Sequence, residues 1–308
     1  MIASQSPLTG IFTPNMVPLD SQGRINESEL ARYVDWLITS GVHGIYPNGS
    51  TGEFTRFSAD ERKRIVEIVC RVAKSRVPVL AGAAEANIRE TLSACEKYAE
   101  YGARAVAVIS PIFYRLGQES IYAYYKEIAR QSPIDVTVYN IPMLSTPIDL
   151  DTIERLSQFE RIIGIKDSSG DVGFMTRMIS RIRPQRPGFT FFTGWEAVLV
   201  PMLAAGADGG TNASSGVIPE VTRRVFDLFK SGNLKDSMAI QYQLTDLFEH
   251  LLRGADFPEG FRAGVEIRGF SMGSSRQPLS QTQQIDRDAL KKMLHCLIAD
   301  LDLVDLPA

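Results

Sequence analysis

The fold depends most on one stretch, Arg161-Ile162-Ile163-Gly164-Ile165-Lys166, which follows a strand-like segment ending in Tyr139-Asn140-Ile141-Pro142. The run before the lysine is apolar and rich in β-branched residues, a pattern typical of a short, buried parallel strand. Burial disfavours the charged form of an amine, so Lys166 is expected to act as a nucleophile towards a carbonyl. The alternative is a lysine that ends the strand and extends its ammonium group into solvent.

Strand-like and helix-like segments alternate along the chain, as parallel βαβ units require. Capping boxes predict helix starts, for example Ser58 with Glu61. The predicted strands are residues 8–13, 43–47, 77–81, 105–110, 136–139, 162–166, 189–193 and 207–211. Eight such units predict an α/β fold, a (β/α)8 TIM barrel, with its active site at the C-terminal ends of the strands.

The pattern is only helical from about Val221 onward, and it includes a final helix predicted over Leu290–Leu303. We therefore expect the barrel over residues 1–225 and a C-terminal helical extension over residues 226–308, both within one structural unit. A chain of 308 residues with 44% hydrophobic and 22% charged residues has ample core for this fold.

Composition also limits the partners and the compartment. A formal charge of −3 argues against nucleic acid or an acidic membrane surface as partner. The sequence lacks both a spanning apolar run and a signal-peptide pattern at its start, so a cytoplasmic protein is predicted. The three cysteines, Cys70, Cys95 and Cys296, have no C-x-x-C spacing and are expected to be buried free thiols.

Two motifs carry a resemblance to a known family. The segments Tyr139-Asn140-Ile141-Pro142-Met143-Leu144-Ser145 and Gly164-Ile165-Lys166-Asp167-Ser168 are similar to the Schiff-base signature of the dihydrodipicolinate synthase/N-acetylneuraminate lyase family. The segment Gly44-Ile45-Tyr46-Pro47-Asn48-Gly49-Ser50-Thr51-Gly52-Glu53-Phe54 resembles the family's second signature. The resemblance covers nearly the whole chain. It implies a class I aldolase or lyase without metal or cofactor that forms homotetramers.

The resemblance also implies roles for single residues. Lys166 would form the Schiff base with pyruvate or another 2-oxo acid, and Tyr139 would move protons during catalysis. The loop carrying Gly49, Ser50 and Thr51 would bind the substrate carboxylate, with Thr51 also counted among the catalytic groups. Taken alone, this loop reads equally well as a tight turn, and Tyr139 as a core aromatic. Glu53 is expected to anchor the base of the loop.

Two departures separate the chain from dihydrodipicolinate synthases. Leu144 stands where those enzymes have an arginine for the aldehyde's carboxylate, and Phe113 stands at their relay tyrosine, with Tyr114 one place further. A leucine cannot pair with a carboxylate and a phenyl ring cannot relay a proton. Tyr114 remains a candidate for the interface or the relay.

A different departure separates the chain from sialic acid lyases. Their Gly-Tyr-Asp-Glu segment for the sugar is replaced by Gly194-Trp195-Glu196-Ala197, and Ala213 replaces a later serine. A shorter 2-oxo-3-deoxy sugar acid, or a similar 2-oxo acid, is therefore the expected substrate. The candidates around its tail are Ser168, Gly194, Glu196 and Thr211.

Several alternatives stay open at this level. The same lysine could serve a dihydrodipicolinate synthase, an N-acetylneuraminate lyase, or a dehydratase or deaminase of a related acid. A silent barrel that only binds a 2-oxo acid is the non-enzymatic alternative. The glycine-rich segment 206–216 could bind phosphate, although it contains no lysine or arginine. The sequence does not place Arg262, Arg268 and Arg276 relative to the active site.

Overall fold

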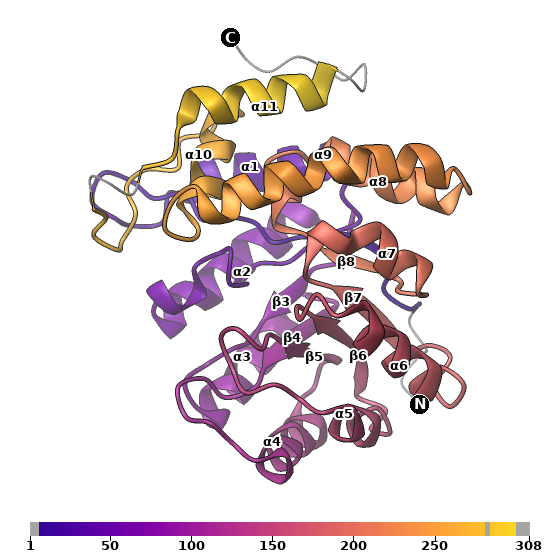
Figure 1. Ribbon diagram of the computed structural model, residues 1–308. Helices are drawn as coiled ribbons and strands as arrows, with labels where there is room; N and C mark the ends of the chain where they lie inside the picture. Colours follow the sequence, from indigo (N-terminus) through magenta and orange to yellow (C-terminus); the bar gives the residue numbers. More distant parts are fainter. Residues whose placement is uncertain (1–5, 281–283, 300–308) are drawn as a thin grey trace.

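Eight parallel strands form the centre of the molecule, in the order β2-β1-β8-β7-β6-β5-β4-β3. A computed structural model describes residues 6–280 and 284–299 (Figure 1). The strands are β1 Gly10–Thr13, β2 Gly44–Ile45, β3 Leu80–Gly82, β4 Ala105–Ile109, β5 Val136–Asn140, β6 Ile162–Asp167, β7 Thr190–Thr193 and β8 Gly209–Thr211. Every predicted strand is present, most of them shortened by one to three residues.

The two edges of this sheet, β2 and β3, meet and complete the barrel. Ile45 forms an isolated parallel bridge with Val79. The Ile45 N–H donates to the Pro78 carbonyl at 3.1 Å, and the Gly82 N–H donates to the Pro47 carbonyl at 2.8 Å. The barrel predicted from the repeating units is therefore confirmed, and its C-terminal strand ends share one mouth.

Helices cover the barrel, and their starts follow the predicted capping signals. Ser58 and Glu61 form a complete capping box at the second helix, and the side chains of Asn26, Asn87 and Asp171 each cap a helix. The barrel helices are α1 Glu27–Thr39, α2 Ala59–Ala73, α3 Ile88–Glu100, α4 Gln118–Gln131, α5 Leu150–Leu156, α6 Val172–Ile182, α7 Leu199–Ala204 and α8 Pro219–Lys230. Short 3-10 helices are η1 Phe54–Arg56, η2 Glu196–Val198 and η3 Ala213–Gly216.

The C-terminal extension consists of α9 Leu234–Arg253, α10 Glu259–Ile267 and α11 Arg287–Ala299. In Figure 1 it forms a layer over one side of the barrel, where α9 packs against α8 and η2. The predicted boundary at residues 225/226 lies within α8, and the last residues of the helix predicted over Leu290–Leu303 lie outside the described residues.

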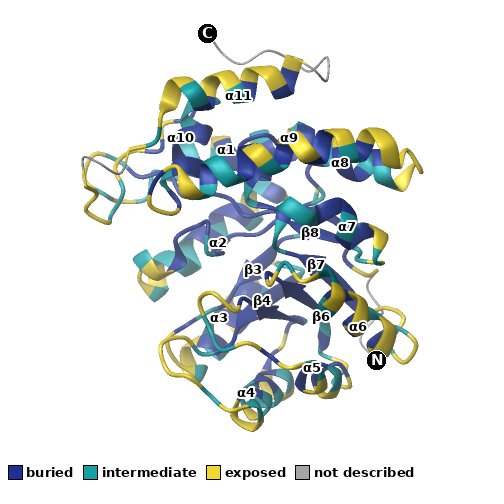
Figure 2. Ribbon diagram, in the orientation of Figure 1, coloured by how far each residue is buried: buried dark blue, intermediate teal, exposed yellow. Residues whose placement is uncertain are grey.

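Burial follows the layers of the barrel: the strands are buried and the outer helix faces are exposed (Figure 2). One small cluster fills the interior of the barrel: Leu8, Phe12, Tyr46, Leu80, Ala105, Ala107 and Phe192. The main core lies between strands and helices and continues into the extension. The prediction of buried thiols is confirmed for Cys95, whereas Cys70 is only half-buried. It is wrong for Cys296, which is exposed because α11 buries Leu290, Leu294 and Leu297 on its other face.

A β-bulge in β6 determines the direction of Lys166. Val136 pairs with Ile162, but the next residue, Thr137, pairs with Gly164, so one residue of β6 has no partner in β5. Side chains alternate along a strand, and Ile162 faces the helices, so an unbroken alternation would point Lys166 outward. The extra residue reverses the alternation, and Lys166 faces the interior.

Candidate active site

Lys166 lies at the end of β6 with only 4% of its surface exposed. Its Nζ lies 4.1 Å from the ring centroid of Tyr139 and 4.7 Å from that of Tyr46. Burial, and secondly the neighbouring Tyr139, raise the pKa of Tyr46 well above its ordinary value, so Tyr46 remains a neutral phenol. The lysine is therefore held between two aromatic rings and does not extend into solvent.

Tyr139 and the loop after β2 meet beside this lysine. The Tyr139 hydroxyl lies 3.5 Å from Ser50 Oγ, a contact in which either group can donate. Thr51, the next residue, is buried and lines the cavity that opens above Lys166. Gly49 does not line this cavity. A Cβ there would lie 2.8 Å from Cε1 of Tyr46, so Gly49 lets the Tyr46 ring pack against the loop.

The base of this loop is held by ion pairs. Glu53 is buried in a left-handed conformation with φ of 56°. Its Oε2 accepts a hydrogen bond from Arg262 Nη1 at 2.8 Å, and its Oε1 accepts one from Arg56. Arg262, which sequence alone could not place, therefore supports the loop from α10. The structure agrees with the anchoring role predicted for Glu53.

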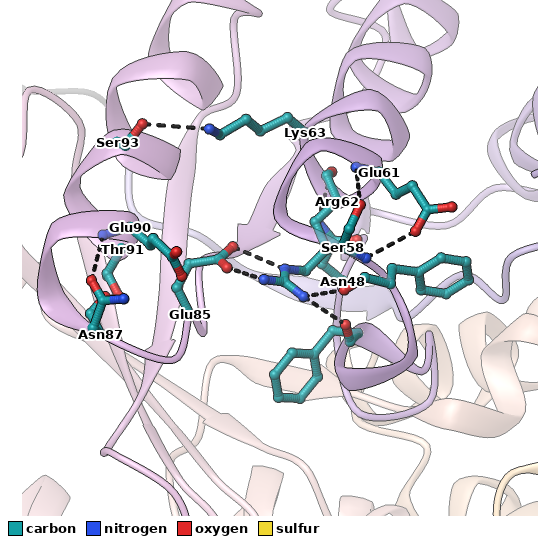
Figure 3. Close-up of polar contacts among 12 residues, drawn as sticks. Asn48, Ser58, Glu61, Arg62, Lys63, Glu85, Asn87, Glu90, Thr91 and Ser93 are labelled. Carbon is teal, nitrogen blue, oxygen red and sulfur yellow. Dashed lines mark hydrogen bonds and ion pairs between the residues drawn. The ribbon is translucent and has the colours of Figure 1, made fainter. Parts of the chain in front are cut away.

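A second network fixes the same loop from the side of α2 (Figure 3). The guanidinium of Arg62 makes two bonds to the Glu85 carboxylate and further bonds to the backbone carbonyls of Phe54 and Phe57. Asn48 donates to the Arg62 carbonyl at 2.9 Å. The Glu85 side chain is 1% exposed and that of Arg62 is 11% exposed. Sequence analysis missed this pair because its members follow different strands.

Close packing at the end of β7 holds Lys166 in place from the other side. A Cβ on Gly194 would lie 2.0 Å from Ser168 Oγ and 2.6 Å from Lys166 Cε. Ser168 is buried, and its N–H donates to the Asn140 carbonyl at 2.9 Å. The side chain of Asn140 donates to Asp167 Oδ1 at 2.6 Å, which joins the ends of β5 and β6.

Glu196 is placed differently from the expectation. It is fully buried and does not line the cavity; its carboxylate accepts bonds from Ser214 Oγ at 2.9 Å and from the Ser214 N–H. Burial raises the pKa of Glu196 to about 7. These bonds join the carboxylate to the turn after β8.

A cavity of about 560 Å³ opens above Lys166. Ser50, Thr51, Tyr139, Ser168, Gly194 and Thr211 all line it, as the sequence predicted. Thr211 Oγ1 is buried and has no hydrogen-bond partner within the described part of the chain. The remaining lining residues are Pro14, Ile141, Met143, Leu144, Trp195, Ala213, Phe248, Leu252, Arg253, Phe257 and Phe261. Phe248, Leu252, Arg253 and Phe261 come from α9 and α10, which the motifs do not include.

Tyr114 and Phe113 lie outside this cavity. Tyr114 is 74% exposed and Phe113 is 91% exposed, with a left-handed φ of 78° at Phe113. Both line a separate hollow of about 300 Å³. Arg268 pairs with Glu220, and Arg276 pairs with Glu61, so neither contributes to the cavity above Lys166.

Two further findings concern metals and membranes. Within residues 6–280 and 284–299, no group of three His, Cys, Asp or Glu side chains is arranged to hold a metal ion. None of the helices in these ranges combines the length and hydrophobicity that a membrane crossing requires.

A (β/α)8 barrel with a buried lysine, a phenol and paired hydroxyls at its strand ends defines the class of Schiff-base lyases. The chain belongs to the dihydrodipicolinate synthetase family, whose model matches residues 7–297. Members are class I pyruvate-dependent aldolases, so this chain is a lyase of that type. The resemblance carried by the two motifs is confirmed.

Relatives of known sequence agree with this assignment. A DapA-like lyase from Halobacterium salinarum is 30% identical, over 96% of this chain and 95% of the relative. A 4-hydroxy-tetrahydrodipicolinate synthase from Acidiphilium cryptum is 31% identical, over 88% of this chain and 92% of the relative.

Solved structures share the fold over almost the whole chain. YagE, a prophage protein from E. coli crystallised with pyruvate, has a TM-score of 0.88 at 26% identity, covering 94% of this chain and 98% of YagE. CdNal from Clostridium difficile, crystallised with mannosamine, has a TM-score of 0.84 at 26% identity, covering 96% of this chain and 99% of CdNal. Pyruvate is bound in one of these structures and mannosamine in the other, so the substrate of this chain must be argued from its own residues.

Proposed function

We propose that Lys166 forms a Schiff base with the ketone of pyruvate or of a 2-oxo acid. The carbon–carbon bond between the α and β carbons of this imine then forms or breaks through the enamine. The observation that carries this proposal is the position of Nζ, which is buried between two rings at the floor of the cavity. Attack by the neutral amine expels the ketone oxygen as water, and the resulting iminium accepts the electron pair of the broken bond.

The neighbours of Lys166 support roles in the same reaction. Tyr139 gives and takes the proton of the reacting oxygen. Ser50 Oγ lies 3.5 Å from the Tyr139 hydroxyl and connects Tyr139 to the loop that carries Ser50 and Thr51. Ser50 and Thr51 bind the substrate carboxylate. The free hydroxyl of Thr211, together with Ser168, offers hydrogen bonds to the next substrate atoms.

The substrate is a hydroxy-2-oxo acid that is cleaved to pyruvate and an aldehyde, or formed from them. A 2-oxo-3-deoxy sugar acid, expected from the sequence, would find hydroxyl partners only near Lys166. Dihydrodipicolinate synthesis is the second candidate, but Leu144 is 53% exposed at the position of the carboxylate-binding arginine and offers no charge. Elimination by a dehydratase or deaminase would use the same enamine.

Assembly into a homotetramer is part of this proposal. Large apolar side chains are exposed together after β4 and β5: Ile112, Phe113, Tyr114, Met143 and Leu144. Contiguous apolar surface of this kind is characteristic of subunit contacts. A monomeric mass by light scattering at micromolar concentration would contradict the assembly.

The free thiols of Cys70, Cys95 and Cys296 support a reducing, cytoplasmic location.

Borohydride reduction in the presence of pyruvate tests the mechanism. Intact-mass analysis should show one pyruvate adduct on the wild type and none on Lys166→Ala. Lys97→Ala, which removes an exposed lysine paired with Glu100, is the control and should be modified like the wild type. A wild type without adduct, or an undiminished adduct on Lys166→Ala, would refute the role of Lys166.

A further inference from the structure

Aromatic rings form one wall of the cavity above Lys166. Trp195 packs edge-to-face on Phe248 with centroids 5.4 Å apart, and Phe257 packs edge-to-face on Phe261 at 5.9 Å. Phe248 and Phe261 join the two pairs at 6.4 Å. All four residues line the cavity. Trp195 immediately precedes η2, Phe248 lies on α9, Phe257 lies in the loop between α9 and α10, and Phe261 lies on α10. The buried rings Phe248 and Phe261 make this wall a fixed part of the core.

Aliphatic side chains complete the outer lining. Ile141, Met143 and Leu144 follow β5, and Leu252 lies on α9. The one charged lining residue besides Lys166 is Arg253, whose side chain is 71% exposed and already paired with Glu249 at 2.8 Å. The hydroxyl groups that line the cavity all come from the strand ends and the loop around Lys166. The polar groups of the lining thus gather around Lys166, and the rest of the lining is mostly apolar.

We infer that the aldehyde partner of this lyase is an aromatic aldehyde, whose ring packs against Trp195, Phe248, Phe257 and Phe261. This inference rests on the proposed function and specifies the substrate class for it. Rings pack favourably edge-to-face or offset against other rings, which the lining provides. The hydroxyl or carboxylate groups of a sugar-derived or amino-acid-derived aldehyde would lose their water here and find no partner.

The reaction balances without an oxidant or a metal. Tyr139 gives its proton to the water that leaves as the imine of Lys166 and pyruvate forms, and it then takes a proton from the methyl carbon of the imine. The resulting enamine attacks the aldehyde carbon through its methylene carbon, and Tyr139 regains its proton at the end from the water that hydrolyses the imine. The new carbon–carbon bond forms as the carbonyl electron pair moves to oxygen, which takes a proton from Tyr139. One water hydrolyses the imine, equal to the water released when it formed, and the product is a 4-aryl-4-hydroxy-2-oxobutanoate. Cleavage runs through the same steps in reverse.

A panel of aldehydes with pyruvate tests the inference, with product formation followed by mass spectrometry. Benzaldehyde should have a kcat/KM about 100-fold above that of glyceraldehyde or aspartate semialdehyde, because an apolar pocket discriminates by about that factor against a substrate whose polar group it leaves unpaired. Phe257 is 38% exposed at the rim, so Phe257→Ser should fold and lower kcat/KM for benzaldehyde about tenfold, with a smaller effect on the borohydride-trapped pyruvate adduct.

Tyr242→Ser is the matched control, because Tyr242 is another exposed aromatic residue of the extension: it lies on α9, is 65% exposed and does not line the cavity. It should retain wild-type kinetics. A trapped pyruvate adduct combined with equal or better turnover of glyceraldehyde or aspartate semialdehyde, or with no turnover of benzaldehyde, overturns the inference and leaves the proposed function intact. Absence of the adduct from the wild type overturns both.

Discussion

Replacing Gly194 by alanine should displace Lys166. The added methyl carbon would lie 2.6 Å from Lys166 Cε, whereas carbon atoms in contact are about 3.5–4.0 Å apart. Lys166 must therefore move by about 1 Å, and a misplacement of that size lowers the catalytic rate about 100-fold. The methyl group would also lie 2.0 Å from Ser168 Oγ, and overpacking of this kind costs about 1–3 kcal/mol of unfolding free energy.

The rate at which the borohydride-trapped pyruvate adduct forms measures the displacement of Lys166. A urea unfolding curve measures the loss of unfolding free energy separately. Gly188→Ala is the control, because a Cβ there meets nothing closer than Pro7 Cγ at 4.0 Å, and it should behave as the wild type. Adding Ser168→Gly to Gly194→Ala removes the hydroxyl contact and should restore part of the stability while the adduct rate stays low. A Gly194→Ala variant with wild-type adduct formation would show that Lys166 is not held by this contact.

Further predictions concern the proton donor, the loop network and a buried carboxyl. Tyr139→Phe should lower kcat about 10²–10⁴-fold, the range of general acid–base catalysis, while Tyr242→Phe leaves steady-state kinetics unchanged. Arg62→Met breaks the buried pair with Glu85 and should lower the unfolding free energy in urea by about 3–5 kcal/mol. Arg64 lies on the same helix α2 and pairs with Glu27 of α1 at the surface, so Arg64→Met should cost less than about 1 kcal/mol. Burial raises the pKa of Glu196 from 4.5 to about 7, so at intermediate pH the folded protein binds a proton that the unfolded chain has released. Stability should fall by up to about 3 kcal/mol as the pH rises from 4.5 to 7, and Glu196→Gln should flatten this slope; an unchanged slope would contradict the raised pKa.

Much of the fold could be predicted from local patterns. The eight strands and the caps at Asn26, Ser58, Asn87 and Asp171 follow from short-range periodicity and from hydrogen bonds within one helix turn. The position of Lys166 at a strand end, and of Tyr139 one strand earlier, was also readable, because parallel strands end on the same rim of a barrel.

Other parts of the site depend on contacts between distant segments. Phe248 and Phe261 show only the apolar periodicity of core helices, and nothing local indicates that their rings turn towards a lysine at residue 166. Glu196 had the chemistry of a substrate ligand, but Ser214, which follows the neighbouring strand β8, binds its carboxylate. The Arg62–Glu85 pair links helix α2 to the loop after β3, and these two segments come together because β2 and β3 meet when the barrel closes.

The sequence by itself determined that a lysine ends the sixth strand beside a tyrosine and a hydroxyl loop, since residue identity and strand order are local properties. Only the tertiary structure decided that Lys166 faces the interior. The alternation of side chains counted from Ile162 points it outward, and the register between β5 and β6 reverses that direction by skipping one residue. Register depends on how two strands pack against each other, and a bulge within a run of similar apolar residues leaves no mark in the sequence of one strand.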